Sequence, residues 1–308
     1  MKVLLVSGFL GAGKTTFIRE LASHSGPDIA IMENEFGAAG LDGDLLKREL
    51  TQAEIWELTE GCACCTQKES FTESVLTIAN TLDPECLIVE PTGVAYLSNL
   101  IRNLMRIQYE RIVLLKPLVI VDGRSIGRCM QEYPEIFDDQ VRSAGTVLLS
   151  KLENAQPEER LQAEALVHKI APEVPVLTEH YSLQPQEFWD RLWQQAYDQS
   201  LITVPAKEEA ILPETRVITR PVLPAAGDVV FLMEDIIRGT YGGVIRAKGV
   251  IFAEDTGWLR FELADSAYSL LTVDDPGPWQ AVFLGRGIYD IPLPAAPKKK
   301  DNSKRPSR

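Results

Sequence analysis

Residues 8–15 have the types and spacing with the clearest chemistry in this chain, GFLGAGKT. Glycines in such a segment let backbone N–H groups turn toward a phosphate, and Lys14 adds a positive charge for the β- and γ-phosphate oxygens. The Thr15 hydroxyl can ligate Mg²⁺. Because the segment follows an apolar stretch at 3–6 and precedes a helix-compatible one, it predicts a phosphate-binding loop (P-loop); a plain glycine-rich turn is the alternative. The nucleotide contacts predicted here are Gly8, Gly11, Ala12, Gly13, Lys14, Thr15 and Thr16.

A second group of candidates follows the apolar stretch at 87–89, in the sequence LIVEPTG. A P-loop enzyme needs an acidic residue at the end of another strand to hold Mg²⁺, directly or through water, near the γ-phosphate. Glu90 is placed for that role, and we predict that it acts with Lys14 in catalysis. Gly93 would let the next turn approach the γ-phosphate and report nucleotide state. The alternative for Glu90 is an exposed carboxylate at a strand end.

Three of the five cysteines lie in one short segment, GCACC, at Cys62, Cys64 and Cys65. They are too close together for an ordinary disulfide framework, and thiolates bind soft or borderline metals, with zinc the simplest candidate. One loop does not complete a tetrahedral zinc site, so Glu35, water or a partner protein would supply the rest. Glu35 also belongs to an acidic, glycine-containing segment, ENEFGAAGLD, that is typical of a switch. Redox-active thiols and inert cysteines are the alternatives to metal binding.

The candidates for base recognition lie in the sequence VLLSKLE. Guanine-specific P-loop proteins use Asn-Lys-x-Asp after a late strand, where the Asp carboxylate accepts hydrogen bonds from guanine. Here Ser150 and Glu153 stand at the Asn and Asp positions, and Lys151 can still cover the base. We therefore predict a weakened guanine preference, with an ordinary helix start as the alternative. The three histidines are scattered along the chain, and we predict surface or capping roles for them.

The elements that must position these residues follow from apolar segments that alternate with longer helix-compatible ones. Such alternation predicts an α/β fold with a mainly parallel sheet flanked by helices, and with the segment at 8–15 it predicts a P-loop nucleotide triphosphatase. The predicted strands are residues 3–6, 29–32, 55–58, 87–89, 118–121 and 147–149, with a last one at 176–177.

Prolines then interrupt the chain between about 203 and 224, where we place a linker. Beyond it, a helix is predicted at 228–238 and strands at 244–252, 258–263, 268–273 and 280–284, a small C-terminal α+β domain. The predicted organisation is a nucleotide-binding domain at 1–204, a linker at 205–216, the α+β domain at 217–293 and a disordered basic tail at 294–308.

Composition limits the classes of function. A formal net charge of −13 disfavours a general nucleic-acid binder, because phosphate backbones attract clustered Lys and Arg. The first residues carry a lysine, an apolar run and small residues, but the first strand and the P-loop need them, so a signal peptide is not predicted. No stretch approaches the roughly 18 apolar residues of a membrane helix, and the thiol cluster suits a reducing compartment. We expect a cytoplasmic protein.

The motifs GFLGAGKTT, ENEFG…GLDGDLL, GCACC, EPTG, VIVDG, Gln140 and SKLE occur here in one order and spacing. In this the chain resembles the CobW-like GTPases, a family with YjiA-type proteins and zinc-transfer GTPases that is related to the nickel-insertion GTPases of urease and hydrogenase maturation. The resemblance covers residues 2–180 and, through RAKGV at 246–250, extends more weakly to about 292. The chain departs from the family in SKLE, in the proline of EPTG and in having no histidine-rich stretch.

The resemblance implies a GTPase that uses Mg²⁺, binds Zn²⁺, Co²⁺ or Ni²⁺ at the CxCC loop, and couples nucleotide state to metal delivery. Glu35 would match an acidic position of the family that touches Mg²⁺ or the bound metal. The implied partner is a metalloprotein client or metal-dependent enzyme, and a second copy of the chain is a further candidate because it would complete a thiol site that lacks ligands. Two alternatives stay open, a small-molecule kinase and a nucleotide-dependent adaptor.

Overall fold

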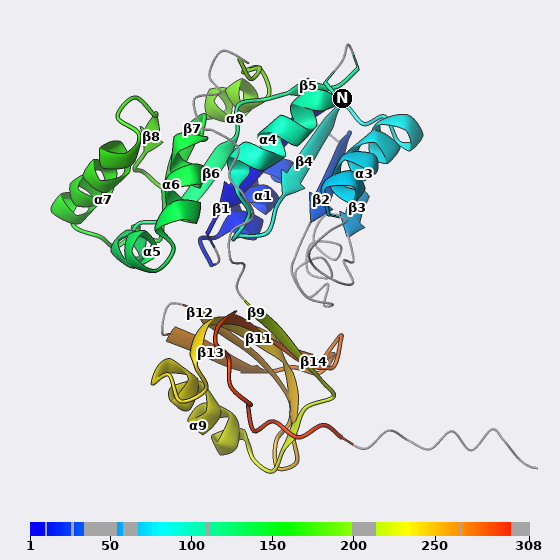
Figure 1. Cartoon of the computed structure of the whole chain (residues 1–308), viewed down its shortest axis with the longest axis vertical. Helices are drawn as coiled ribbons and strands as arrows, with labels where there is room; N and C mark the ends of the chain where they lie inside the picture. Colours follow the sequence, from blue (N-terminus) through cyan, green and yellow to red (C-terminus); the bar gives the residue numbers. More distant parts are fainter. Residues whose placement is uncertain are drawn as a thin grey trace, which may run out of the picture. The chain divides into compact units, whose positions relative to one another are not determined.

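The computed structural model describes residues 1–9, 11–25, 28–33, 54–57, 67–108, 111–198, 214–264 and 267–296; for 54–57 and 67–70 it describes the backbone only. The chain divides into two compact units, Met1–Pro213 and Glu214–Arg308, each with its own sheet (Figure 1).

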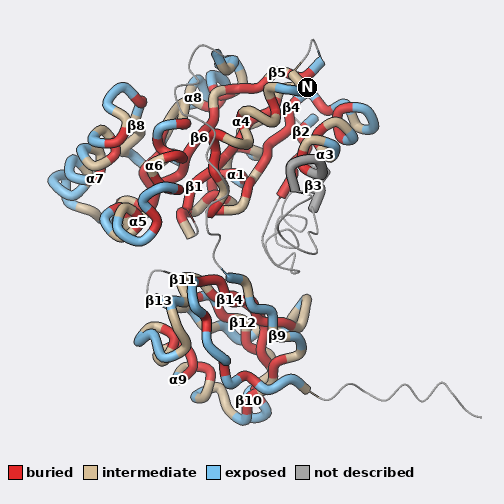
Figure 2. The backbone as a smooth tube through the Cα atoms, viewed as in Figure 1, coloured by how far each residue is buried: buried red, intermediate tan, exposed pale blue. Residues whose placement is uncertain are grey.

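The first unit is built on a parallel sheet, as the alternation of apolar segments predicts. Its described strands run in the order β3-β2-β4-β1-β6-β7-β8, and β5 pairs with β1. Strands β1, β2 and β4 are almost wholly buried, as expected where helices cover both faces of a sheet (Figure 2). The strands are β1 Lys2–Gly8, β2 Ile29–Glu33, β3 Glu54–Glu57, β4 Cys86–Glu90, β5 Val113–Leu114, β6 Leu118–Asp122, β7 Thr146–Ser150 and β8 Val176–Leu177.

Helices cover the two faces of this sheet. On one face α3, α4, α6 and α7 contact one another in series (Figure 1). On the other face Leu4 and Val6 of β1 join a core with Phe17 of α1 and Trp189 of α8, whose rings lie 5.7 Å apart. The helices are α1 Lys14–Ser23, α3 Gln67–Thr81, α4 Leu97–Arg106, α5 Ile126–Glu132, α6 Pro134–Arg142, α7 Pro157–Ile170, the 3-10 turn η1 Tyr181–Leu183, and α8 Gln186–Leu192.

The carboxyl ends of these parallel strands meet at one edge of the sheet. The register pairs Gly8 with Ile120, Glu33 with Glu90, and Asp122 with Ser150. Polar residues thus end β2, β4, β6 and β7 at the edge where β1 turns into α1. Ligands of open parallel sheets bind at this edge.

The second unit confirms the predicted α+β class. Its sheet has the order β13-β12-β11-β14-β9 with antiparallel neighbours, β10 pairs with β11 in parallel, and α9 packs against one face through Val229, Met233 and Ile236. The elements are β9 Glu214–Thr219, β10 Val222–Leu223, α9 Ala226–Ile237, β11 Gly243–Ala253, β12 Gly257–Ala264, β13 Ala267–Thr272 and β14 Gln280–Arg286.

Two predicted boundaries of this unit were wrong. Residues 214–216, placed in the linker, belong to β9 because they pair with β14 along its last residues. Residues 294–296, placed in the disordered tail, bond to the sheet: Val222 donates to the Pro294 carbonyl, and Ala296 donates to the Arg220 carbonyl at 2.8 Å. The remaining limits of the domains stay predictions, and residues 297–308 lie outside the described part of the chain.

Candidate nucleotide-binding site

The loop between β1 and α1 has the backbone that its glycines predict. Gly8, Gly11 and Gly13 have φ of 145°, 75° and 95°, values that side chains disfavour. A Cβ on Gly8 would collide with the Ile120 carbonyl of β6, so the loop leaves the sheet only with glycine there. Gly13 is the N-cap of α1 and no side chain caps this helix. The end of α1 therefore offers backbone donors and the positive end of its dipole to an anion.

The structure brings together the three predicted residues that would handle Mg²⁺ and phosphate. The Thr15 hydroxyl donates to the Glu90 carboxylate, with 3.3 Å to Oε1 and 3.2 Å to Oε2. The Lys14 Nζ lies 3.8 Å from Glu90 Oε1 and 3.5 Å from the Phe9 carbonyl oxygen. Lys14 is only 6% exposed, so its ammonium group is largely shielded from water. A hydroxyl, a carboxylate and an ammonium at the end of an uncapped helix fit a Mg²⁺–triphosphate group.

Sequence reasoning missed the position of Glu33, the last residue of β2. Glu33 is 8% exposed and lies in register with Glu90 on one side and Glu57 on the other. The signal in the sequence was its place at the carboxyl end of a parallel strand, and the prediction chose Glu35 instead. Glu35 and the three cysteines of the CxCC segment lie outside the described residues. Within the described ranges, no three His, Cys, Asp or Glu side chains are arranged to hold a metal ion.

Gln140 of α6 anchors the segment between Glu90 and α4 that contains Gly93. Its side chain is fully buried, and its Nε2 donates to the Gly93 carbonyl at 3.2 Å and to the Ala95 carbonyl at 3.1 Å. The neighbouring Asp139 accepts from the backbone N–H and the hydroxyl of Ser98 at the start of α4. Two adjacent residues of one helix thus hold the predicted γ-phosphate sensor at Gly93 and Ala95 and the start of α4 at Ser98. A nucleotide contact of Gly93 itself stays a prediction.

The candidate base-recognition residues lie at the end of β7. The Ser150 hydroxyl donates to the Ala12 carbonyl of the P-loop at 2.7 Å, so it ties β7 to the loop. Lys151 has a left-handed backbone, with φ of 59°, and its Nζ lies 2.8 Å from the buried carboxylate of Asp122. Glu153 is half-exposed, with Oε1 3.4 Å from His180 Nε2. Direct contact of Ser150, Lys151 and Glu153 with a nucleotide stays a prediction.

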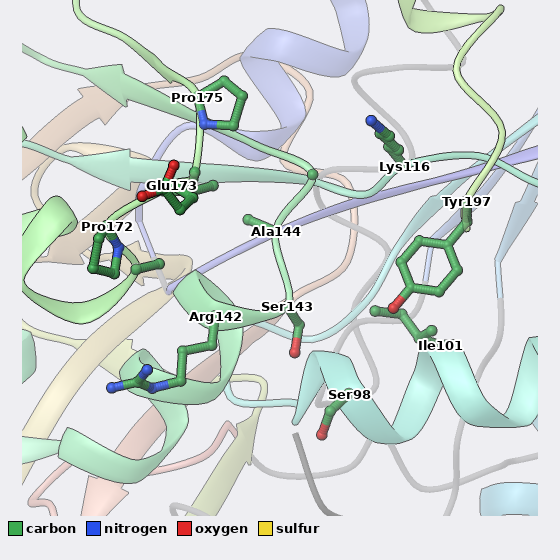
Figure 3. A pocket seen from close by; sticks show the side chains of 13 residues that line it. Ser98, Ile101, Lys116, Arg142, Ser143, Ala144, Pro172, Glu173, Pro175 and Tyr197 are labelled. Carbon is green, nitrogen blue, oxygen red and sulfur yellow. The ribbon is translucent and has the colours of Figure 1, made fainter. Parts of the chain in front are cut away.

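A cavity of about 550 Å³ lies in the same unit, away from these residues (Figure 3). Lys116 and Gly145, which line it, precede β6 and β7, so the cavity adjoins the amino ends of these strands, whereas the P-loop adjoins their carboxyl ends. Figure 3 shows Ser98 and Ser143 among the side chains that line it, with the Tyr197 ring beside Ile101. The cavity is thus distinct from the nucleotide site.

A parallel sheet, a glycine loop that leads into Lys14 and Thr15, and a strand-end acid in contact with both define a P-loop nucleotide-binding protein. The family model described as "CobW/HypB/UreG, nucleotide-binding domain" matches residues 2–178, more than half of the chain. The chain belongs to this CobW/HypB/UreG family.

Individual relatives match over the same region. The zinc chaperone CobW of Pseudomonas aeruginosa is 33% identical over 209 residues, which cover 57% of this chain and 54% of that protein. The zinc chaperone YjiA of Escherichia coli K12 is 32% identical over 184 residues, 57% of this chain and 56% of that protein. This chain thus matches little more than half the length of these curated relatives.

Solved structures also align with the chain. The Zn(II)-bound YjiA GTPase from E. coli is 20% identical with a TM-score of 0.45, and covers 94% of this chain and 95% of its own. HypB from Helicobacter pylori in complex with nickel is 20% identical with a TM-score of 0.44, and covers 62% of this chain and 85% of its own. Among the described residues, no helix combines the length and the apolar character needed to cross a membrane.

Proposed function

We propose that this chain hydrolyses GTP and couples nucleotide state to the delivery of a zinc-, cobalt- or nickel-type metal. The observation that carries the hydrolytic part is the contact of both Thr15 and Lys14 with Glu90 beside the P-loop. The metal part is supported by the CxCC segment and by relatives named as zinc chaperones. The proposed site of action is the cytoplasm, and the proposed recipient is a metalloprotein client.

Hydrolysis in this proposal depends on position and charge, not on a covalent intermediate. Lys14 exchanges its contact with Glu90 for the β- and γ-phosphate oxygens, while the donors at the start of α1 bind the phosphates. Mg²⁺, when bound with the triphosphate, supplies positive charge against the oxygens that gain charge in the transition state. Thr15 would be one of its ligands. Glu90, released from Lys14, would help to hold Mg²⁺, directly or through water.

The arrangement of β2 and β4 supports coupling between nucleotide and metal. Glu33 and Glu90 end neighbouring strands in register, and the chain continues from Glu33 into the segment that holds Glu35 and the CxCC motif. When Glu90 at the end of β4 changes its contacts, the change therefore occurs next to the end of β2, where the segment with Glu35 and the CxCC motif begins. The metal bound by Cys62, Cys64 and Cys65 would be the cargo, and a client or a second copy of the chain would complete its ligands.

The test compares GTP and ATP hydrolysis by the full chain, with and without one equivalent of Zn²⁺ or Co²⁺. Wild type is compared with a Cys62/Cys64/Cys65→Ser variant. We expect GTP to be preferred and the effect of metal on turnover to be lost in the variant. Turnover that ignores both metal and cysteines would refute the coupling, and phosphorylated metabolite in place of free phosphate would favour a kinase.

Thiol protection gives a second readout of the same proposal. Cys86 and Cys129 are buried, and burial raises the pKa of the Cys86 thiol to about 11. Alkylation at neutral pH should therefore spare these two thiols and report the CxCC segment. We expect Zn²⁺ to slow alkylation of the native protein and to have no effect on the triple-serine variant. Equal alkylation rates with and without Zn²⁺ in wild type would argue against a thiolate metal site.

A further inference from the structure

We infer that His180 is a positioning residue for base recognition, whose Nε2 restricts the Glu153 carboxylate so that it can accept from guanine. The inference rests on the proposed GTP specificity and names the device that would supply it. The length of the Glu153 side chain is the reason that a positioning residue is needed. Glu153 has one more rotatable bond than the Asp expected at this position, and an unrestrained carboxylate loses more conformational entropy when it must meet a base.

The hydrogen bonds of His180 determine which ring nitrogen carries the proton. The backbone N–H of Ser182 lies 3.3 Å from Nδ1, and the Ser182 hydroxyl lies 2.6 Å from it. A backbone N–H can only donate, so Nδ1 is an acceptor and carries no hydrogen. The neutral ring therefore has its hydrogen on Nε2, the atom 3.4 Å from Glu153 Oε1. Nε2 of His180 is thus the ring atom that faces the carboxylate, in close approach at 3.4 Å and not in a formed hydrogen bond.

The backbone on the Glu153 side is held independently of this contact. The hydroxyl of Ser150 donates to the P-loop, and the next residue, Lys151, is held by its ion pair with Asp122. The Glu153 carbonyl accepts from Arg160 at 3.1 Å. The turn after β7 therefore carries Lys151 and Glu153 at a fixed distance from the P-loop, and the contact with His180 restricts the one flexible part, the Glu153 side chain.

The His180 side is anchored in the core. Its ring lies 4.2 Å from that of Tyr181, which is buried and meets Phe17 of α1 edge-on at 5.0 Å. His180 also caps η1 through Nδ1, as the capping role predicted for the histidines anticipates. Since α1 begins at the P-loop, the two ends of the nucleotide site share one rigid support. The ligand that this arrangement suits is a purine with two adjacent N–H donors, which guanine has and adenine lacks.

The experiment measures dissociation constants of the full chain for fluorescent GTP, ITP, XTP and ATP analogues with Mg²⁺. Inosine lacks the 2-amino group, and xanthine replaces it with an oxygen. We expect E153Q to weaken GTP and improve XTP, because an amide can donate to that oxygen. We expect H180A to weaken GTP about fivefold, the scale of one hydrogen bond, and to leave ATP unchanged. GTP discrimination against ITP should fall in the same variant.

Two controls separate the contact with Glu153 from the capping of η1. In H180S the serine hydroxyl can still accept from the Ser182 N–H but does not reach Glu153, so H180S should lose selectivity as H180A does. The double variant H180A/E153A should cost no more GTP affinity than E153A alone. Restored selectivity in H180S, or additive losses in the double variant, would overturn the role of His180.

The outcomes also distinguish this inference from the proposed function. If wild type binds ATP as tightly as GTP, the proposed guanine preference is wrong. If wild type prefers GTP and H180A keeps the same selectivity with an unaltered thermal unfolding midpoint, only the role of His180 in base recognition is wrong.

Discussion

The phosphate end and the base end of the candidate site lie at one edge of the sheet, but they are built differently. At the phosphate end, a single continuous segment, 8–15, supplies the loop and its donors, and one acid completes it. At the base end, side chains from the last residue of β6 and from the turns after β7 and β8 lie close together, as in the pairs Lys151–Asp122 and Glu153–His180. Where backbone N–H groups bind the ligand, the backbone angles determine which residue types the loop accepts. Where pairs of side chains form the site, a residue can be replaced and the geometry kept.

The largest expected effect tests the phosphate end. Lys14→Ala removes the buried ammonium beside Glu90, so we expect phosphate release from GTP to fall by more than about a hundredfold. Steady-state phosphate release checks this. Lys116→Ala, a lysine lining the cavity at the opposite edge of the sheet, is the matched control and should retain wild-type turnover. Turnover by Lys14→Ala close to that of the control would mean that the P-loop is not the catalytic centre.

Glu90→Gln tests the acid without changing its size. The amide loses the negative charge that faces Lys14 and Thr15, so we expect kcat to fall about a hundredfold while GTP binding changes by less than about threefold. Single-turnover hydrolysis and a separate binding titration distinguish the two. A loss confined to binding would assign Glu90 to ground-state contacts only.

Gln140→Met tests the anchor of the Gly93 segment. The variant removes the buried donor that the carbonyls of Gly93 and Ala95 share, so we expect the free energy of unfolding to drop by about 2 kcal/mol. We also expect slower hydrolysis and an unchanged GTP to ATP ratio, since the base end is untouched. Asp138→Asn, an exposed position of the same helix, is the control; a surface ion pair there is worth at most about 1 kcal/mol. Denaturant unfolding and hydrolysis assays measure both.

Ser150→Ala should give the smallest effect, and it tests whether Ser150 serves the phosphate end or the base end of the site. Alanine has no hydroxyl to tie β7 to the Ala12 carbonyl, so affinity for GTP and ATP should weaken equally, by about fivefold, in a binding titration. Ser150→Asn restores a donor and should recover part of that affinity. Weaker binding of GTP alone would instead place Ser150 at the base.

Much of the first unit could be predicted because the signals were local. Each predicted apolar segment is a strand, and GFLGAGKT predicted the loop because its glycines must adopt backbone angles that other residues disfavour. Glu90 could be predicted in the same way, from its place at the end of an apolar run. The ends of the second unit could not, since β9 and residues 294–296 are held by long-range pairing that local composition does not reveal.

The sequence by itself determined the α/β class, the P-loop and the residues that would handle phosphate, because these depend on periodicity and on glycine chemistry within one segment. Only the tertiary structure decided that Glu33 lies beside Glu90, that Ser150 ties β7 to the P-loop, and that His180 reaches Glu153. These contacts join residues that are far apart in the chain. Their existence depends on strand order and register, which place several strand ends at one edge and which no single segment specifies.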